Sequence, residues 1–356
     1  MTMPYLGENL VFIISQPRAG STLLQRILGS HTDIAISSEP WLMLHPVYGL
    51  REQGIKTDYS HDWAIRGVTE FLDNYTDGLE VYDDGIRAFA QTIYFNAMAK
   101  GNGRWFVDKT PRYLMILDDL LRLFPQAKFI FLLRNPLSVL SSIVNSQVSH
   151  DLYTLERFRE ELLDGPAAML SAINKLGDEA VVVRYENFVQ EPEKQAARLC
   201  DAIGIDYQPG MIEYSESEPV KGFMQDRTGI NQHDRPSSSR IDAWQQMLTD
   251  MQQIHFAQSY LRELGRTVIE EMGYSFDELN DAVRAAAERN RGGKVALPWR
   301  LALLHPQDAK GLDQIMITRY RRTRDRGPLY ANLMVVKSLY KGMMRGFEFM
   351  FGRAKK

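Results

Sequence analysis

An apolar run, a short turn and a helical run make up Leu10–Leu28 (LVFIISQPRAGSTLLQRIL), and this segment constrains the fold of the chain more than any other. Leu10–Ile14 has the continuous apolar character of a buried strand, and Ser21–Leu28 has helical character, with Pro17 and Gly20 in the turn between them. Such a turn points backbone N–H groups and the positive end of a helix dipole at one place. We therefore expect an anion, in particular a phosphate, to bind there.

The turn also supplies side chains that suit an anion. Gly20 lets the backbone approach closely, Ser21 and Thr22 add hydroxyl donors, and Arg18 adds a guanidinium. A loop that holds a nucleoside triphosphate has the pattern G-x-x-x-x-G-K-[ST], but Ser15 stands at the first glycine position and Ser21 at the lysine position. The turn therefore predicts an anion site without a triphosphate–magnesium unit, and we expect no metal. The alternative is an ordinary strand–turn–helix of an α/β protein.

Further apolar runs alternate with helical patterns along the 356 residues. The expected strands cover residues 33–38, 105–110, 128–134 and 180–185, and the expected helices cover residues 63–75, 85–99, 114–124, 136–148, 167–176, 191–203, 241–272 and 277–289. Near-continuous apolar strands that alternate with helices are typical of a parallel sheet buried on both faces. We therefore predict an α/β fold, a P-loop-like parallel sheet flanked by helices on both faces.

Charged and aromatic side chains stand where the expected strands end. The residues at or just past these ends are Arg18, Glu39, Lys109, Arg134 and Tyr185. In parallel α/β sheets, ligands bind beyond the carboxyl ends of the strands. We therefore expect four charged groups and one ring to surround a single crevice.

Arg134 and Ser142 form a second candidate anion site. Arg134 ends an expected strand, and Ser142 stands eight residues later, in the helix that Pro136 opens. Together with the turn at Arg18, the sheet would then have two separate phosphate sites, which is the layout that adenosine with 5′ and 3′ phosphates requires. A nicotinamide dinucleotide fits less well, because the chain has no G-x-G-x-x-G motif with an acidic residue placed for a ribose.

Three segments resemble motifs of the sulfotransferases that use 3′-phosphoadenosine 5′-phosphosulfate (PAPS). QPRAGSTLL resembles their 5′-phosphosulfate loop, FIFLLRNPLSVLSS resembles their 3′-phosphate motif, and VVRYENFVQEPEK is similar to their adenine-side segment. The resemblance covers roughly residues 8–275. It implies PAPS as co-substrate, adenosine 3′,5′-bisphosphate as product, and the transfer of a sulfuryl group to a hydroxyl-bearing acceptor.

The resemblance also implies roles for single residues. Arg134 and Ser142 would hold the 3′-phosphate, and Tyr185 would lie beside the adenine. In this family a basic residue of a late loop often closes over the 3′-phosphate, and Lys221, Arg227 and Arg240 are all candidates. The residues that would hold the 5′-phosphosulfate are Arg18, Ala19, Gly20, Ser21 and Thr22.

Glu39 is the candidate general base. The phenol and steroid branch of the family places a histidine two residues after a lysine, but Lys109 is followed by Thr110 and Pro111 here. The carbohydrate, tyrosyl and many bacterial branches use a glutamate after the second strand instead, which Glu39 matches. Lys109 and Arg18 are expected to stabilise the charge that grows on the leaving group. Alternatively, Glu39 caps a helix or pairs with Arg18, Lys109 is a solvated surface residue, and His45 is the reserve base.

The composition divides the chain into a main domain and a basic extension. We assign residues 1–290 to a sulfotransferase domain, with residues 41–104 as a lid or acceptor-binding insertion, and residues 291–356 to a helical extension. From residue 319 onwards the extension has 11 Lys/Arg and 2 Asp/Glu, a net charge of +9, and an apolar stripe at helical spacing that includes Leu333, Val336 and Tyr340. This helix is predicted to bind an anionic membrane, or to pack its apolar face on the domain or on a second subunit as a homodimer.

The overall prediction is a PAPS-dependent sulfotransferase that acts on a glycan, lipid or small-molecule hydroxyl. The alternatives are a P-loop-like kinase and a non-catalytic nucleotide-binding protein. A net charge of −3 gives the chain no general attraction to nucleic acid. The single cysteine, Cys200, excludes an internal disulfide, and the sequence has no long apolar run or leader pattern. We therefore expect a cytoplasmic protein, with association with a membrane surface as the alternative.

Overall fold

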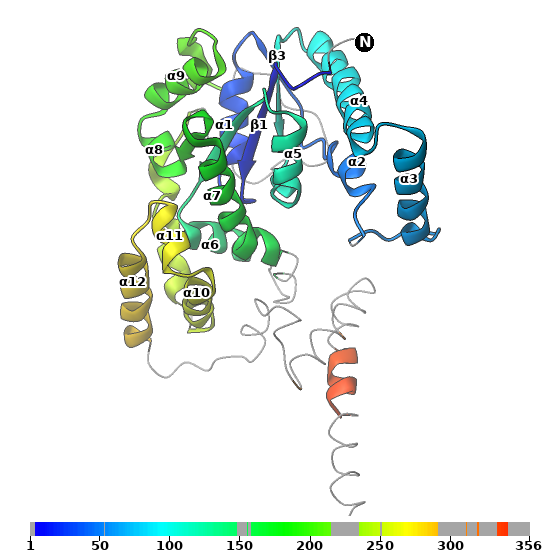
Figure 1. Ribbon diagram of the computed structural model, residues 1–356. Helices are drawn as coiled ribbons and strands as arrows, with labels where there is room; N and C mark the ends of the chain where they lie inside the picture. Colours follow the sequence, from blue (N-terminus) through cyan, green and yellow to red (C-terminus); the bar gives the residue numbers. More distant parts are fainter. Residues whose placement is uncertain are drawn as a thin grey trace, which may run out of the picture. The chain divides into compact units, whose positions relative to one another are not determined.

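Figure 1 shows the computed structural model of the chain. It describes residues 4–52, 54–147, 155, 158–214, 235–249, 251–290, 311, 319 and 333–340. The chain forms two compact units: Met1–Val139 with Asp164–Ala243, and Leu140–Leu163 with Trp244–Lys356. The first unit contains the sheet. The predicted boundary at residue 290 stays a prediction.

The sheet has five strands, all parallel, in the order β2-β3-β1-β4-β5. The strands are β1 (Leu10–Ser15), β2 (Ile34–Ile36), β3 (Trp105–Lys109), β4 (Lys128–Leu133) and β5 (Val181–Arg184). Every residue of β1 is buried, which requires cover on both faces of the central strand. The predicted parallel α/β sheet is confirmed.

Two groups of helices flank the sheet (Figure 1). One group is α1 (Ser21–Gly29) and α9 (Pro192–Ile203), both of which contact the 3-10 turn η5 (Pro209–Ile212). The other is α4 (Leu79–Lys100), α5 (Leu117–Leu123) and α7 (Gly165–Leu176), which contact one another in series. The first unit also contains α2 (Leu44–Tyr48), α3 (His61–Tyr75), the 3-10 elements η1 (Pro111–Ile116), η4 (Gly177–Glu179) and η7 (Ser238–Arg240), and α8 (Tyr185–Gln190).

The remaining described elements belong wholly or partly to the second unit. They are α6 (Pro136–Gln147), which starts in the first unit, the π-helical turn η3 (Glu160–Asp164), the 3-10 helix η8 (Ala243–Thr249), α10 (Met251–Leu264), α11 (Arg266–Glu271) and α12 (Phe276–Arg289). The prediction of a single helix over residues 241–272 is therefore wrong, because three elements cover this range. Leu248 leaves helical geometry, and Gly265 has φ +85°, which ends α10 before α11 begins. The sequence analysis predicts no helix at the position of the single-turn helix α8, because it assigns Tyr185 to the preceding strand.

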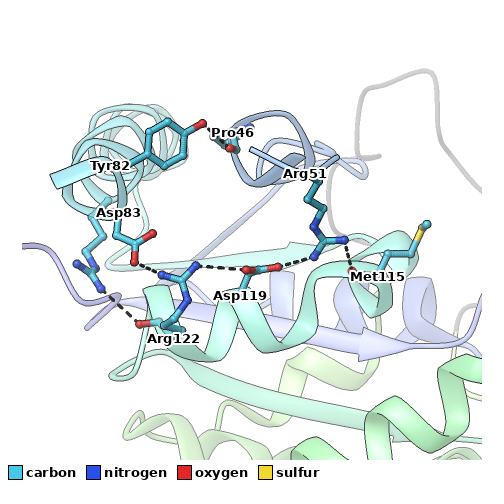
Figure 2. Close-up of polar contacts among 8 residues, drawn as sticks. Pro46, Arg51, Tyr82, Asp83, Met115, Asp119 and Arg122 are labelled. Carbon is cyan, nitrogen blue, oxygen red and sulfur yellow. Dashed lines mark hydrogen bonds and ion pairs between the residues drawn. The ribbon is translucent and has the colours of Figure 1, made fainter. Parts of the chain in front are cut away.

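A chain of ion pairs ties the insertion of residues 41–104 to α5 (Figure 2). Arg51, just after α2, donates to Asp119 at 2.5 Å and to the carbonyl of Met115 at 2.9 Å. Asp119 also accepts from Arg122 at 3.2 Å, and Arg122 forms an ion pair with Asp83 of α4. Two separate parts of the insertion, at Arg51 and at Asp83 of α4, are thus held on α5.

In contrast, α3 is almost entirely exposed. Leu72 is the one buried residue of this helix, while Trp63, Phe71 and Tyr75 are 73%, 57% and 79% exposed. Phe71 and Tyr75 stack on each other with ring centroids 5.8 Å apart. The insertion therefore presents aromatic rings to solvent on α3.

Of the basic extension, the structure describes little beyond residues 333–340, which are helical. Leu333, Val336 and Tyr340 are 64–65% exposed, and Val335 is buried. Within the described residues, the structure contains no helix that is both long and apolar enough to cross a membrane.

Candidate functional site

The turn between β1 and α1 has an unusual backbone. Arg18 has φ +68° and Gly20, the N-cap of α1, has φ +101°. Glycine adopts such a conformation without strain, whereas a side chain does so only at a cost. Ala19 and Ser21 are buried, and the N-cap residue Gly20 has no side chain that could cap the first turn of α1. The turn therefore has the backbone geometry that an anion site at a helix N-terminus needs.

Gly20 packs directly against the ring of Tyr185. A Cβ atom at position 20 would lie 2.5 Å from Cδ2 and 2.7 Å from Cε2 of Tyr185. Tyr185 follows β5, so this contact joins the turn after β1 to the end of an outer strand. The absence of a side chain at Gly20 is thus required by both the backbone angle and the neighbouring ring.

Arg134 is buried next to the same ring. Its guanidinium carbon lies 4.0 Å from the centroid of the Tyr185 ring, a cation–π contact. Nη1 donates to the carbonyl of Arg18 at 2.9 Å, and Nη2 donates to the carbonyl of Arg240 at 3.3 Å. Arg134 is therefore a fixed, buried cation beside the β1–α1 turn, rather than a surface charge.

Glu39, Lys109 and Thr22 meet on the other side of the turn. Lys109 Nζ lies 2.7 Å from Glu39 Oε1 and donates to Thr22 Oγ1 at 3.4 Å. The side chain of Lys109 is only 3% exposed and that of Glu39 is 15% exposed. Lys109 is therefore not a solvated surface residue. It joins the glutamate after β2 to the hydroxyl at the start of α1.

Trp41 is a second partner of Glu39. Its indole Nε1–H donates to Glu39 Oε2 at 3.3 Å, so each oxygen of the carboxylate accepts one hydrogen bond and keeps a further acceptor site. Trp41 has φ +54°, a strained conformation for a bulky residue. Trp41 is not among the site residues that the sequence analysis predicts. Its place two residues after Glu39 was a signal that could have identified it.

Asp108 lies next to Lys109 in β3 and is fully buried. It accepts hydrogen bonds from the hydroxyls of Tyr94 at 2.6 Å, Tyr113 at 2.8 Å and Thr110 at 3.0 Å. Burial raises the pKa of Asp108 to about 6, although these hydrogen bonds and the charge of Lys109 act in the opposite direction. The sequence analysis does not select Asp108 as a site residue, because no motif in the sequence singles it out.

The contacts form a line along the carboxyl ends of the strands. In the order of the sheet, they join Glu39 after β2, Lys109 of β3, the turn after β1, Arg134 after β4 and Tyr185 after β5. The structure thus brings the predicted crevice residues together in two groups. Glu39 contacts Lys109 on one side of the turn. On the other side, Arg134 contacts Tyr185 and the backbone carbonyl of Arg18. Their roles in binding or catalysis stay predictions.

The remaining predicted site residues lie elsewhere or outside the described residues. Ser142 is half-buried in α6, in the part of that helix assigned to the second unit. Lys221 and Arg227 lie outside the described residues. Arg240 contacts Arg134 through its carbonyl oxygen. His45, the reserve base, is exposed on α2.

A family model matches more than half of the chain. Residues 10–209 match the model of the sulfotransferase family. Nodulation protein NoeE of Sinorhizobium fredii is 29% identical over 317 residues, which is 82% of this chain and 71% of that protein. A putative protein-tyrosine sulfotransferase of Caenorhabditis briggsae is 27% identical over 218 residues, 59% of this chain and 70% of that protein. The sulfotransferase domain from the curacin biosynthetic pathway aligns with a TM-score of 0.48 at 19% identity, covering 83% of this chain and 100% of that domain.

Proposed function

Since the chain belongs to the sulfotransferase family, we propose that it transfers the sulfuryl group of PAPS to an acceptor hydroxyl, with Glu39 as the general base. The observation that carries this proposal is the contact of Lys109 Nζ with both Glu39 and Thr22 at the carboxyl edge of the sheet. It puts a candidate base, a buried cation and the candidate phosphosulfate turn within one hydrogen-bonded cluster.

The proposed reaction needs a proton acceptor and a stabiliser of negative charge. The acceptor oxygen forms a bond to sulfur while the bond from sulfur to the bridging 5′-phosphate oxygen breaks, and adenosine 3′,5′-bisphosphate leaves. Glu39 takes the hydroxyl proton, an effect typically worth ~10²–10⁴-fold in rate. Lys109 and Arg18, with the N–H groups of the turn, stabilise the charge on the leaving oxygen. Because Lys109 contacts both Glu39 and Thr22 of the turn, the same cation would lie near the proton acceptor and near the leaving group.

The two ends of the donor would bind on the two sides of the same turn. Ala19, Gly20, Ser21 and Thr22 would hold the 5′-phosphosulfate through backbone N–H groups and hydroxyls. Arg134 would contribute to the 3′-phosphate site, and Tyr185 would lie by the adenine. The stacking of Arg134 on Tyr185 supports this, because it fixes the guanidinium before the donor binds.

We expect adenosine 3′,5′-bisphosphate to bind the purified protein and ATP with magnesium neither to bind nor to compete. The physical reason is that the turn has Ser21 where a triphosphate loop has its lysine, while Arg134 offers a second anion site. Isothermal titration with each nucleotide measures this. Tight binding of ATP with magnesium, and no binding of the bisphosphate, would favour the kinase alternative.

The insertion of residues 41–104 is the proposed acceptor-binding region. Its exposed rings on α3, among them Trp63 and Phe71, suit a glycan, a lipid or an aromatic acceptor alike. A screen of these acceptor classes with labelled donor identifies which one is used.

The basic extension is a proposed contact for an anionic membrane or for a second subunit. Removing all residues after Gly327 deletes the exposed apolar residues Leu333, Val336 and Tyr340 together with the basic side chains around them. We expect the truncated protein to lose binding to liposomes of anionic lipid while it keeps its affinity for the donor. Light scattering of both proteins serves as the second readout, and loss of a dimer with unchanged liposome binding would assign the extension to the subunit contact instead.

A further inference from the structure

Asp108 is a buried charge that the proposed mechanism does not use. Successive side chains of a strand point to opposite faces, so Lys109 reaches Glu39 while Asp108 points away from it, toward Tyr94 of α4 and Tyr113 of η1. Asp108 is 1% exposed, and removing a carboxylate from water costs free energy. The hydroxyl groups that donate hydrogen bonds to Asp108 indicate the role of this carboxylate.

The ionised carboxylate fixes the direction of two hydroxyl groups. A carboxylate only accepts hydrogen bonds, and each hydroxyl has one proton. Thr110 and Tyr113 therefore direct their protons at Asp108 and leave their lone pairs free to accept elsewhere. These lone pairs accept the backbone N–H of Trp41 at 3.4 Å and the backbone N–H of Met43 at 3.1 Å. Asp108, Thr110 and Tyr113 form what we name the hydroxyl relay.

The relay holds the segment that carries Glu39. Trp41 and Met43 lie in the turn that leads from β2 to α2, and Trp41 both occupies the strained φ of +54° and donates its indole N–H to Glu39. A strained backbone persists only where surrounding contacts hold it. We propose that Asp108 is a positioning residue, which through Thr110 and Tyr113 keeps Trp41 and Glu39 in place beside Lys109. This inference rests on the proposed function, in which Glu39 is the base.

Protonation of Asp108 would reverse part of this arrangement. The neutral carboxyl has a proton to donate, so one hydroxyl would have to accept it and turn its own proton away. The groups that donate to Asp108 are Tyr94 from α4, Tyr113 from η1 and Thr110 at the end of β3. The charge of Lys109, on the opposite face of β3, also lowers the pKa of Asp108. The hydrogen bond from Tyr94 lowers the pKa of Asp108, although burial, the larger effect, raises it.

A pair of matched variants tests the relay. Tyr113→Phe and Tyr94→Phe each remove one buried hydroxyl that donates to the same oxygen, Asp108 Oδ2. Of the two, the Tyr113 hydroxyl also accepts the N–H of Met43, so only its loss releases the turn. We expect kcat for sulfuryl transfer at pH 8 to fall about 10–100-fold in Tyr113→Phe, with unchanged affinity for adenosine 3′,5′-bisphosphate. We expect Tyr94→Phe to keep the wild-type kcat at pH 8 but to lose activity at a higher pH than the wild type as the pH is lowered.

A second readout is independent of activity. The indole N–H resonance of Trp41 in an NMR spectrum of the full chain, assigned by its absence in Trp41→Phe, reports on the contact with Glu39. We expect Tyr113→Phe to shift this resonance and Tyr94→Phe to leave it unchanged. Equal losses of kcat in the two variants, or an unshifted Trp41 resonance in Tyr113→Phe, would overturn the inference. If the wild-type protein transfers no sulfuryl group, the proposed function fails, while the resonance still decides whether the relay holds the turn.

Discussion

Glu39→Gln should reduce the turnover of an acceptor by ~10²–10⁴-fold, the usual contribution of a positioned general base, while the affinity for the donor stays unchanged. The substitution keeps the shape of the side chain and removes its ability to take a proton. Donor affinity should be preserved because the proposed phosphate-binding groups lie on the turn after β1 and at Arg134, not on Glu39. Single-turnover rates with labelled PAPS, and titration with adenosine 3′,5′-bisphosphate, separate the two quantities.

Two controls make the Glu39 result specific. Glu52→Gln changes an exposed glutamate of the same insertion and should leave both quantities at their wild-type values. Glu39→Asp keeps the charge but shortens the reach to Lys109 and Trp41, so it should retain part of the activity that the glutamine variant loses. Unchanged turnover in Glu39→Gln would remove Glu39 from the mechanism and leave Lys109 as the only described side chain of that cluster with a catalytic role.

The sheet and the position of the site at its edge could be predicted because both depend on local patterns. Continuous apolar runs such as Leu10–Ile14 and Phe129–Leu133 indicate buried strands, and the residues that follow strands gather at one edge of any parallel sheet. Glu39, Lys109 and Tyr185 were placed at the crevice on that ground, and the resemblance to sulfotransferases implied their roles. No knowledge of the strand order was needed.

The contacts within the site could not be predicted in this way, because they depend on which strands are neighbours. Glu39 meets Lys109 because β2 pairs with β3, although 70 residues separate the two side chains. The role of Asp108 could not be predicted, since its three hydroxyl donors come from Thr110, from η1 and from α4. The strained backbone of Trp41 likewise results from contacts that form only in the folded chain. Sequence patterns place residues at an edge, whereas tertiary packing decides which of them share hydrogen bonds.

Gly20→Ala should be the most damaging small substitution in the donor site. The new Cβ would lie 2.5 Å from Tyr185 Cδ2, and the φ of +101° is unfavourable for alanine. The ring of Tyr185 must therefore move, and Arg134, which stacks on it and donates to the carbonyl of Arg18, must move with it. A hydrogen bond to a charged group contributes about 1.5–3 kcal/mol, so losing one from the nucleotide should weaken donor binding by ~10–100-fold.

Gly204→Ala is the matched control for Gly20→Ala, because it separates backbone strain from the contact with Tyr185. Gly204 has φ +89° at the end of α9, and a Cβ there would meet nothing within 4 Å. Both variants should lower the midpoint of thermal unfolding, since alanine is strained at either position. Only Gly20→Ala should lose affinity for adenosine 3′,5′-bisphosphate, and Tyr185→Leu in the same chain should restore part of the lost stability by vacating the space that the methyl group needs. Equal donor affinities in the two alanine variants would mean that the Gly20–Tyr185–Arg134 contacts do not shape the donor site.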